Sequence, residues 1–277
     1  MIEFESTLKI DELVKSVNIA ELLSDKDLER LGHETVRLYD MDRNSREEWE
    51  QRKEQQFKLA LQVAEKKSFP WQGASNIKFP LITIASLQYH ARAYPALISG
   101  TDVVRCRVIG DDKDGQKEKR AQRVERHMSY QLLESEANWE EEQDKVLLTQ
   151  PIIGCAFKKT YYDANIGEPI RENILARDLV VSYYTKSIET ASRITHVLYR
   201  TKNDIYERVA NGLYLDWPET KLVQPVPTKL KIAEDKIHGL TQPNADPAAP
   251  IELLEMHCFL DLDGDGYEEP YIITVRI

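Results

Sequence analysis

Cysteine is scarce in this chain of 277 residues, which has only Cys106, Cys155 and Cys258. They lie far apart in the sequence, and none belongs to a CxxC pair. Because their number is odd and their spacing wide, they do not indicate a disulfide framework. We expect three small, mostly buried hydrophobic side chains.

Motifs of the common catalytic and metal-binding classes are missing. The six histidines show neither HxxxH nor HxH spacing, which leaves a zinc site poorly supported. The patterns GxSxG, GxxxxGKS/T and GxGxxG do not occur. We therefore expect a protein that is not an enzyme, with no catalytic residues, no cofactor and no metal site.

Long apolar runs and an excess of positive charge are missing too. No apolar run reaches the roughly 18 residues that cross a bilayer, and the start, MIEFESTLKIDELV, lacks the layout of a signal peptide. We expect synthesis in the cytosol and no membrane partner. The net charge of −10 argues against a broad basic face that grips nucleic acid, but allows brief contact through a few residues.

Two capping boxes predict helix starts early in the chain. A helix should begin after Ser24, because Asp27 stands three residues later and apolar residues follow. A second box, from Ser45 to Glu48, predicts another helix. The expected apolar stripe of this second helix is Trp49, Phe57, Ala60 or Leu61, and Ala64, with the stem of Lys53 on the same face.

Prolines suggest the limits of further helices. Pro80 suits the first turn of an apolar helix that continues through Ala93, and Pro95 should stop it. Since this helix is apolar nearly all round, we expect it to be buried. Asn138 should cap a later helix that Pro151 limits. Between the two, a helix from about Lys117 should bury Ala121, Val124, Met128 and Leu132.

Strand patterns complete the picture. Residues 101–109 alternate apolar and basic side chains, which predicts a half-exposed strand. We expect further strands at 152–163, 171–181 and 193–201, a short capped helix at 203–212 and an irregular stretch at 216–250. Two strands around an acidic turn should follow. Long helices with antiparallel strands and hairpins make the expected fold class α+β.

The segment HCFLDLDGDGYEEPYIITV, residues 257–275, looks at first like a calcium loop. Asp261, Asp263 and Asp265 are spaced two apart, but an EF-hand loop needs a Glu at its twelfth position, where Ile272 stands. The flanks have strand-forming composition, and the Asp-Gly pair between them is a strong hairpin signal. We predict a β-hairpin, and a weak cation site formed by the three aspartates is the alternative.

Two charged runs are best explained as exposed faces. Residues 139–144, WEEEQD, fall in the first turn of a predicted helix, where negative charge offsets the macrodipole. A hydrolase that uses Glu141 as a catalytic carboxylate is the alternative. Residues 116–127, QKEKRAQRVERH, mix acids and bases at helical spacing, which indicates a solvated face. For this run, the alternative is a contact surface for an acidic neighbour.

Four segments occur in an order similar to that of a known family. They are FPWQGASNIKFPLITIASLQYHARAYPALI (69–98), RAQRVERHMSYQLLESEANWEEEQDKVLLTQPIIGCAFKKTYYD (120–163), ARDLVVSYYTKSIETASRITH (176–196) and IELLEMHCFLDLDGDGYEEPYIITV (251–275). Together they resemble tailed-bacteriophage portal proteins of the podovirus head-to-tail connector type. The resemblance covers roughly residues 27–277.

The resemblance implies a portal wing-like arrangement of long helices with antiparallel strands and hairpins. Residues 1–200 would form the wing, 201–250 a helix and a Pro-rich excursion towards the stem, and 251–277 a β-hairpin that could belong to the clip. Family members are longer and continue into a second stem helix, a tunnel loop and a crown. We therefore expect this chain to be the N-terminal part of such a protein.

The resemblance also implies a structural subunit of a ring, usually a dodecamer, that conducts phage DNA during packaging and ejection. The implied partners are other copies of the chain, the large terminase subunit, head-completion or adaptor proteins, capsid and scaffolding proteins, and double-stranded DNA. The implied location is the portal vertex of the virion, after assembly in the host cytoplasm. The alternative function is a cation-binding regulatory module that uses Asp261, Asp263 and Asp265.

A ring of this kind needs large contact faces between its subunits. Such subunits meet through heterologous contacts that close by rotation, and aromatic anchors are common in them. Six aromatic residues are available, although each such residue is more often part of the core than of an interface: Trp71, Trp139, Tyr89, Tyr94, Tyr161 and Tyr162.

Overall fold

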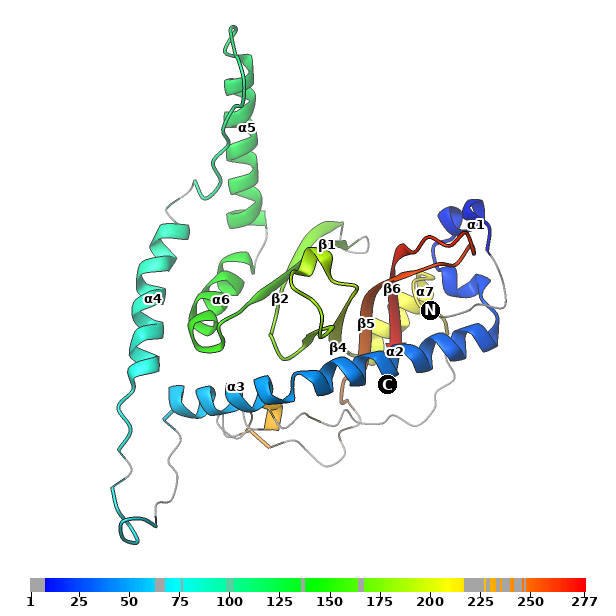
Figure 1. Cartoon of the computed structure of the whole chain (residues 1–277). Helices are drawn as coiled ribbons and strands as arrows, with labels where there is room; N and C mark the ends of the chain where they lie inside the picture. The colour runs from blue at the N-terminus through cyan, green and yellow to red at the C-terminus, as the bar shows by residue number, and fades with distance from the viewer. Residues whose placement is uncertain are drawn as a thin grey trace. The chain divides into compact units, whose positions relative to one another are not determined.

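The computed structural model describes residues 8–62, 68–75, 77–98, 100, 102–135, 138–163, 167–216, 227, 230–232, 235, 240–241, 246 and 248–277 (Figure 1). Its helices and two antiparallel sheets confirm the α+β class. The chain divides into unit 1, Met1–Glu54 with Arg177–Ile277, and unit 2, Gln55–Ala176. Ala64 and most of the expected irregular stretch lie outside the described residues.

Unit 1 is a four-stranded sheet with helices on both faces. Its elements are α1 (Ile10–Lys15), η1 (Ile19–Leu22), α2 (Asp25–Ser45), β3 (Leu179–Val181), η3 (Ile188–Thr190), β4 (Arg193–Arg200), α7 (Lys202–Ala210), β5 (Ile251–Leu260) and β6 (Glu269–Arg276). The strands are antiparallel in the order β3-β4-β5-β6. The predicted strands at 193–201 and around the acidic turn are therefore confirmed.

Apolar side chains along the central strands β4 and β5 point alternately to the two faces of this sheet and contribute to a buried cluster on each face. Val197 and Leu254 pack with α2 residue Tyr39 in one buried cluster, whereas their neighbours Leu198 and Leu253 pack with α7 in another. Successive side chains of a strand point to opposite faces, so one apolar run can serve two layers. Figure 1 shows α2 and α7 on opposite sides of β5.

The caps of these two helices are local and readable from the sequence. Ser24 Oγ accepts a hydrogen bond from the Asp27 backbone N–H at 3.2 Å, as predicted. Thr201 and Asp204 form a reciprocal capping box at the start of α7, which begins at Lys202, one residue before the predicted start. Such caps each contribute about 1 kcal/mol because they satisfy helix N–H groups that lack an intrahelical acceptor.

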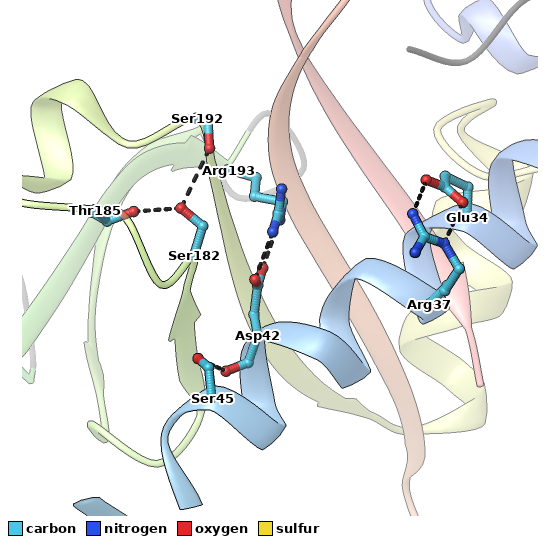
Figure 2. Close-up of polar contacts among 8 residues, drawn as sticks. All are labelled: Glu34, Arg37, Asp42, Ser45, Ser182, Thr185, Ser192 and Arg193. Atoms are coloured by element: carbon cyan, nitrogen blue, oxygen red, sulfur yellow. Dashed lines mark hydrogen bonds and ion pairs between the residues drawn. The ribbon is translucent and has the colours of Figure 1, made fainter.

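The second predicted capping box does not form. Helix α3 (Glu47–Ala60) does begin where expected, but Ser45 is the last residue of α2. Its hydroxyl donates to the Asp42 carbonyl at 2.6 Å instead of accepting from the next helix (Figure 2). An N-cap residue needs an extended backbone, and Ser45 is still helical because α2 runs almost directly into α3.

Unit 2 consists of helices and a two-stranded sheet. Its elements are α4 (Leu81–Leu97), α5 (Gln116–Tyr130), a π-helical turn η2 (Gln131–Ser135), α6 (Trp139–Ile153), β1 (Phe157–Asp163) and β2 (Glu168–Ile174). The boundary between the units falls within α3. Two proline predictions are wrong, because α4 and α6 each run two residues past Pro95 and Pro151. Each proline sits in the last turn, where the loss of a single intrahelical hydrogen bond is tolerated.

The predicted strand at 101–109 does not form. Residues 102–109 are extended, and Val104, Cys106 and Val108 are the less exposed positions, so the alternation itself is confirmed. Their neighbour, however, is α5 rather than a strand. The Val104 N–H donates to Ser129 Oγ at 3.2 Å, and the Cys106 N–H donates to Glu125 Oε2 at 3.4 Å.

This neighbour also changes which face of α5 is covered. Val124 and Met128, predicted to be buried, are 43% and 41% exposed. The covered positions are instead Ala121, Glu125 and Ser129, one helical turn apart. The sequence missed this because Glu125 and Ser129 are polar, and their value lies in accepting backbone N–H groups from the extended segment.

A buried ion pair joins α2 to the sheet of unit 1. Both guanidinium nitrogens of Arg193 that face Asp42 lie 2.6 Å from its carboxylate oxygens (Figure 2). The Asp42 side chain is 3% exposed. Arg37 and Glu34 make the same two-bond arrangement on the outer side of α2, where the Arg37 side chain is 62% exposed. The hydrogen bond from Arg37 lowers the pKa of Glu34.

These two pairs give a matched test of burial. We expect Asp42→Asn to lower the free energy of unfolding by about 2 kcal/mol or more, because it removes the counter-charge of Arg193, whose side chain is only 20% exposed. Glu34→Gln should cost less than about 1 kcal/mol, because water solvates the freed Arg37. Urea denaturation measures both, and equal shifts of the two midpoints would contradict the assignment.

Candidate subunit interface and acidic turn

Helix α4 uses polar side chains to contact its own chain. Thr83, Ser86, His90 and Tyr94, called here the polar ladder, recur at three- and four-residue steps and therefore share one face of the helix. The Thr83 hydroxyl donates to the Ala60 carbonyl of α3. Ser86 is 4% exposed, which places this face inside unit 2.

The other three rungs of the polar ladder meet α6 in antiparallel register. Ser86 Oγ donates to the Leu148 carbonyl at 2.8 Å. His90 Nε2 lies 2.6 Å from Asp144 Oδ1. The Tyr94 hydroxyl donates to Glu140, and this hydrogen bond raises the pKa of Tyr94. Each step of four residues up α4 matches a step of four residues down α6, so the pairing specifies both the rotation and the register of α4.

One flank of α4 carries large apolar side chains that are exposed, and three-residue steps lead from Leu87, beside the polar ladder, round to Leu81 on the far side of the helix. Leu81, Ile84 and Leu87, called here the apolar α4 face, are 66%, 38% and 54% exposed. Four more large apolar side chains are exposed just before the helix: Phe69, Trp71, Ile77 and Phe79. A soluble protein rarely concentrates exposed apolar side chains in this way unless another surface covers them.

The predicted burial of this helix is therefore wrong for the chain by itself. Its all-round apolar character suggested a core helix, but polar residues hold the inner face, and Leu81, Ile84 and Leu87 are left exposed. The signal was present in the spacing of Thr83, Ser86, His90 and Tyr94. This spacing does not reveal the inner face unless it is known that Leu148, Asp144 and Glu140 of α6 lie beside the polar residues of α4.

The aromatic candidates divide between the surface and partly covered sites. Trp71, Tyr89 and Tyr162 are exposed and available to a partner. Trp139 is half-buried, with Lys158 Nζ 5.9 Å from its ring centroid, and Lys159 Nζ lies 5.3 Å from the ring of Tyr161. Tyr94 belongs to the polar ladder.

The acidic run at 139–144 lies in the first turn of α6, as predicted. Lys145 Nζ lies 2.8 Å from Glu141 and 3.0 Å from Glu142, and the Glu141 side chain is 66% exposed. These carboxylates therefore form a solvated cluster that offsets the helix macrodipole. Its members Glu140 and Asp144 also anchor α4.

The three aspartates of the acidic turn connect β5 to β6, so the hairpin prediction is confirmed. Asp261 accepts the Gly264 N–H at 2.7 Å and the Gly266 N–H at 3.0 Å. Both glycines have positive φ, which few other residues adopt at low cost. One carboxylate oxygen from each of Asp261, Asp263 and Asp265 lies within 4.8 Å of the other two. The carboxylates of the three aspartates thus act mainly as acceptors for backbone N–H groups of the same turn.

Two buried acids in unit 1 escaped the sequence analysis. Burial raises the pKa of Asp178, although Arg177 lies beside it, and burial also raises the pKa of Glu252. Tyr199 has a raised pKa for the same reason. The available signal was an acidic residue among apolar neighbours, since Glu252 lies in the apolar start of β5 and Asp178 directly precedes the apolar strand β3.

A hollow of about 610 Å³ lies beside β6 in unit 1. Leu28 and Leu31 of α2, Leu213 and the hairpin residues Ile273 and Val275 are among the mostly aliphatic side chains that line it. Among the residues that the structure describes, its lining includes no carboxylate, thiol or imidazole. The hollow therefore offers apolar surface rather than groups for acid–base chemistry.

The acidic turn yields a prediction about the hairpin. We expect Asp261→Ala to lower the free energy of unfolding by about 1 to 2 kcal/mol, since it removes the acceptor of two backbone N–H groups. Asp263→Ala should cost less than about half as much, because Asp263 accepts one longer bond, at 3.3 Å from the Asp265 N–H. Urea denaturation in the presence of EDTA compares the two variants, and equal losses would refute this account of the turn.

No protein-family model matches the chain, and no curated protein matches it significantly. Among the described residues, no helix combines the length and the apolar character needed to span a bilayer. Function is therefore inferred from the geometry above together with the sequence resemblance.

Proposed function

We propose that this chain is a structural subunit of a phage portal, a ring that conducts DNA through the capsid vertex during packaging and ejection. The observation that carries the proposal is the orientation of α4. Its polar ladder is used within unit 2, and its large apolar residues are left exposed. A surface of this kind is suited to burial against a second copy of the chain.

Two further features support the proposal. The segment that resembles the portal wing motif, 69–98, contains all of α4 together with the exposed apolar residues before it. Ring subunits associate through heterologous contacts, in which one face of a subunit meets a different face of the next. An exposed helix face with aromatic neighbours such as Trp71 and Tyr89 matches the composition of such contacts.

The acidic character of the chain fits the same role. A net charge of −10 would repel a duplex that passes close by and reduce friction against it. The proposed partners are further copies of the chain in a dodecameric ring, the large terminase subunit, head-completion or adaptor proteins, and capsid and scaffolding proteins. The proposed location is the virion, with assembly in the host cytoplasm.

Substitution on the apolar α4 face tests the proposal. We expect the protein to form rings visible in negative-stain images, and Leu87→Asp to weaken subunit association by about 30-fold or more, since a buried charge at the centre of an interface costs at least about 2 kcal/mol. Light scattering after size-exclusion chromatography measures the oligomer over a concentration series.

A matched control separates the interface from general surface effects. Ile188→Asp changes an equally exposed apolar residue of unit 1, 49% exposed against 54% for Leu87, and should leave the oligomer unchanged. Both variants should unfold at the temperature of the unsubstituted protein. A protein that stays monomeric at every concentration, or a control that dissociates as much as Leu87→Asp, would refute the proposed interface.

A second candidate function is a cation-binding regulatory module at the acidic turn. The closeness of three carboxylate oxygens, within 4.8 Å of one another, favours it. Calorimetric titration with calcium discriminates between the two functions. Binding tighter than about 10 μM that is lost in Asp263→Ala would support the module, because this aspartate contributes least to the turn itself. Absence of binding heat up to millimolar calcium would rule the module out.

A further inference from the structure

The outer side of α5 carries a row of basic side chains. Lys119, Arg120, Arg123 and Arg126, called here the basic α5 face, are all exposed. Steps of four and three residues align Lys119, Arg123 and Arg126, and Arg120 lies beside them, so that the four span about a third of the helix circumference. None of the four side chains makes an ion pair or hydrogen bond with another residue of the described chain. Elsewhere, helix cations such as Arg46 and Lys145 are paired with acids.

The contacts of α5 show that Arg123, at the middle of this row, points away from the extended segment 102–109. Glu125 and Ser129 accept hydrogen bonds from the extended segment 102–109, and they lie on the side of the helix opposite Arg123. The extended segment in turn exposes Arg105 and Arg107, while Val104, Cys106 and Val108 are partly covered. Basic side chains are therefore exposed both on α5 and on the extended segment that packs against it.

The charge of this element contrasts with the rest of the chain. Five basic and two acidic residues give α5 a charge of +3, whereas the whole chain has a net charge of −10. An anionic polymer would be repelled by most of the protein and attracted to this one helix. The contact would accordingly be local.

The spacing of the row suits a phosphate backbone. At about 1.5 Å per residue, Lys119 and Arg126 are separated by about 10.5 Å along the helix. One strand of a duplex presents a phosphate about every 3.4 Å along its axis, so the row lies opposite about four phosphates. His127 and Tyr130, exposed on the same side, add hydrogen-bonding tips.

A protein partner fits the row less well. Protein interfaces have an apolar centre from which charged residues are depleted. The row from Lys119 to Arg126 has no apolar residue among its four members, and the exposed Val124 and Met128 lie to one side of it. Guanidinium groups without an apolar centre are typical of phosphate contacts.

We propose that the basic α5 face binds the phosphate backbone of nucleic acid without reading its sequence. This binding does not depend on the proposed ring, because the row lies within one chain and away from the apolar α4 face. Affinity would come mainly from the release of counterions, so that it would fall steeply with salt and change little with base sequence.

Fluorescence anisotropy with a labelled 20-base-pair duplex tests the proposal. With about four phosphates neutralised, we expect a slope of about −3.6 for log affinity against log salt, which is a loss of about 150-fold between 50 and 200 mM salt. The triple variant Arg120→Gln/Arg123→Gln/Arg126→Gln should reduce the slope to about −1, and Arg123→Gln by itself should reduce it by about 1.

A second triple variant controls for net charge. Lys15→Gln/Lys186→Gln/Lys202→Gln removes the same charge from exposed positions of unit 1 and should leave the slope unchanged. The oligomer, sized in the same samples, should be the same for all variants. Equal losses in the two triple variants, or a slope near zero for the unsubstituted protein, would overturn the proposal. So would unchanged DNA binding together with a smaller oligomer in the α5 variant, which would assign the row to a protein partner.

Discussion

Contacts at four-residue steps between α4 and α6 constrain unit 2 more than any other feature. Ser86, His90 and Tyr94 each reach a partner on α6, and these partners are spaced by the same four residues in the reverse direction. A rotation of α4 about its axis would break all three contacts and leave the buried Ser86 hydroxyl unsatisfied, which costs about 1 to 3 kcal/mol. With the polar ladder facing inward, Leu81 lies on the far side of the helix, and Leu87, beside the ladder, is left 54% exposed. The proposed subunit interface is thus a consequence of where the polar residues of one helix find their partners.

Unit 1 is stabilised mainly by apolar layers, and one ion pair specifies how α2 is aligned on the sheet. The central strand β5 is covered on both faces, and α2 is held over one face by the buried Asp42–Arg193 pair. A buried pair of this kind adds little net stability compared with apolar residues of the same size. It does penalise any alternative position of α2 in which either charge would be left unpaired. The acidic turn that closes β5 and β6 is likewise a structural device, in which carboxylates accept the N–H groups of a tight glycine-containing turn.

The limits of sequence reasoning appear in particular residues. The cap at Ser24 and the hairpin around residues 261–266 were predictable, because both depend on contacts within a few positions of the chain. Ser45 failed as a cap since the preceding helix had not yet ended. The extended segment 102–109 has the alternation of a strand, and it differs from one because its neighbour is a helix. Periodicity shows which side of a segment is covered, but the same pattern results whether the covering element is a strand or a helix.

The amino-acid sequence by itself determined the α+β class, most helix starts and the nature of the acidic turn, because propensity, capping and turn chemistry act over a few residues. It also determined that α5 carries a row of basic side chains, since helical spacing follows from position. Only the tertiary structure decided which faces those elements present. The exposure of the apolar α4 face depends on α6 residues about 50 to 60 positions away, and the freedom of the basic α5 face depends on an extended segment that covers the opposite side. Burial is a property of neighbours, and neighbours distant in sequence are brought together only by packing.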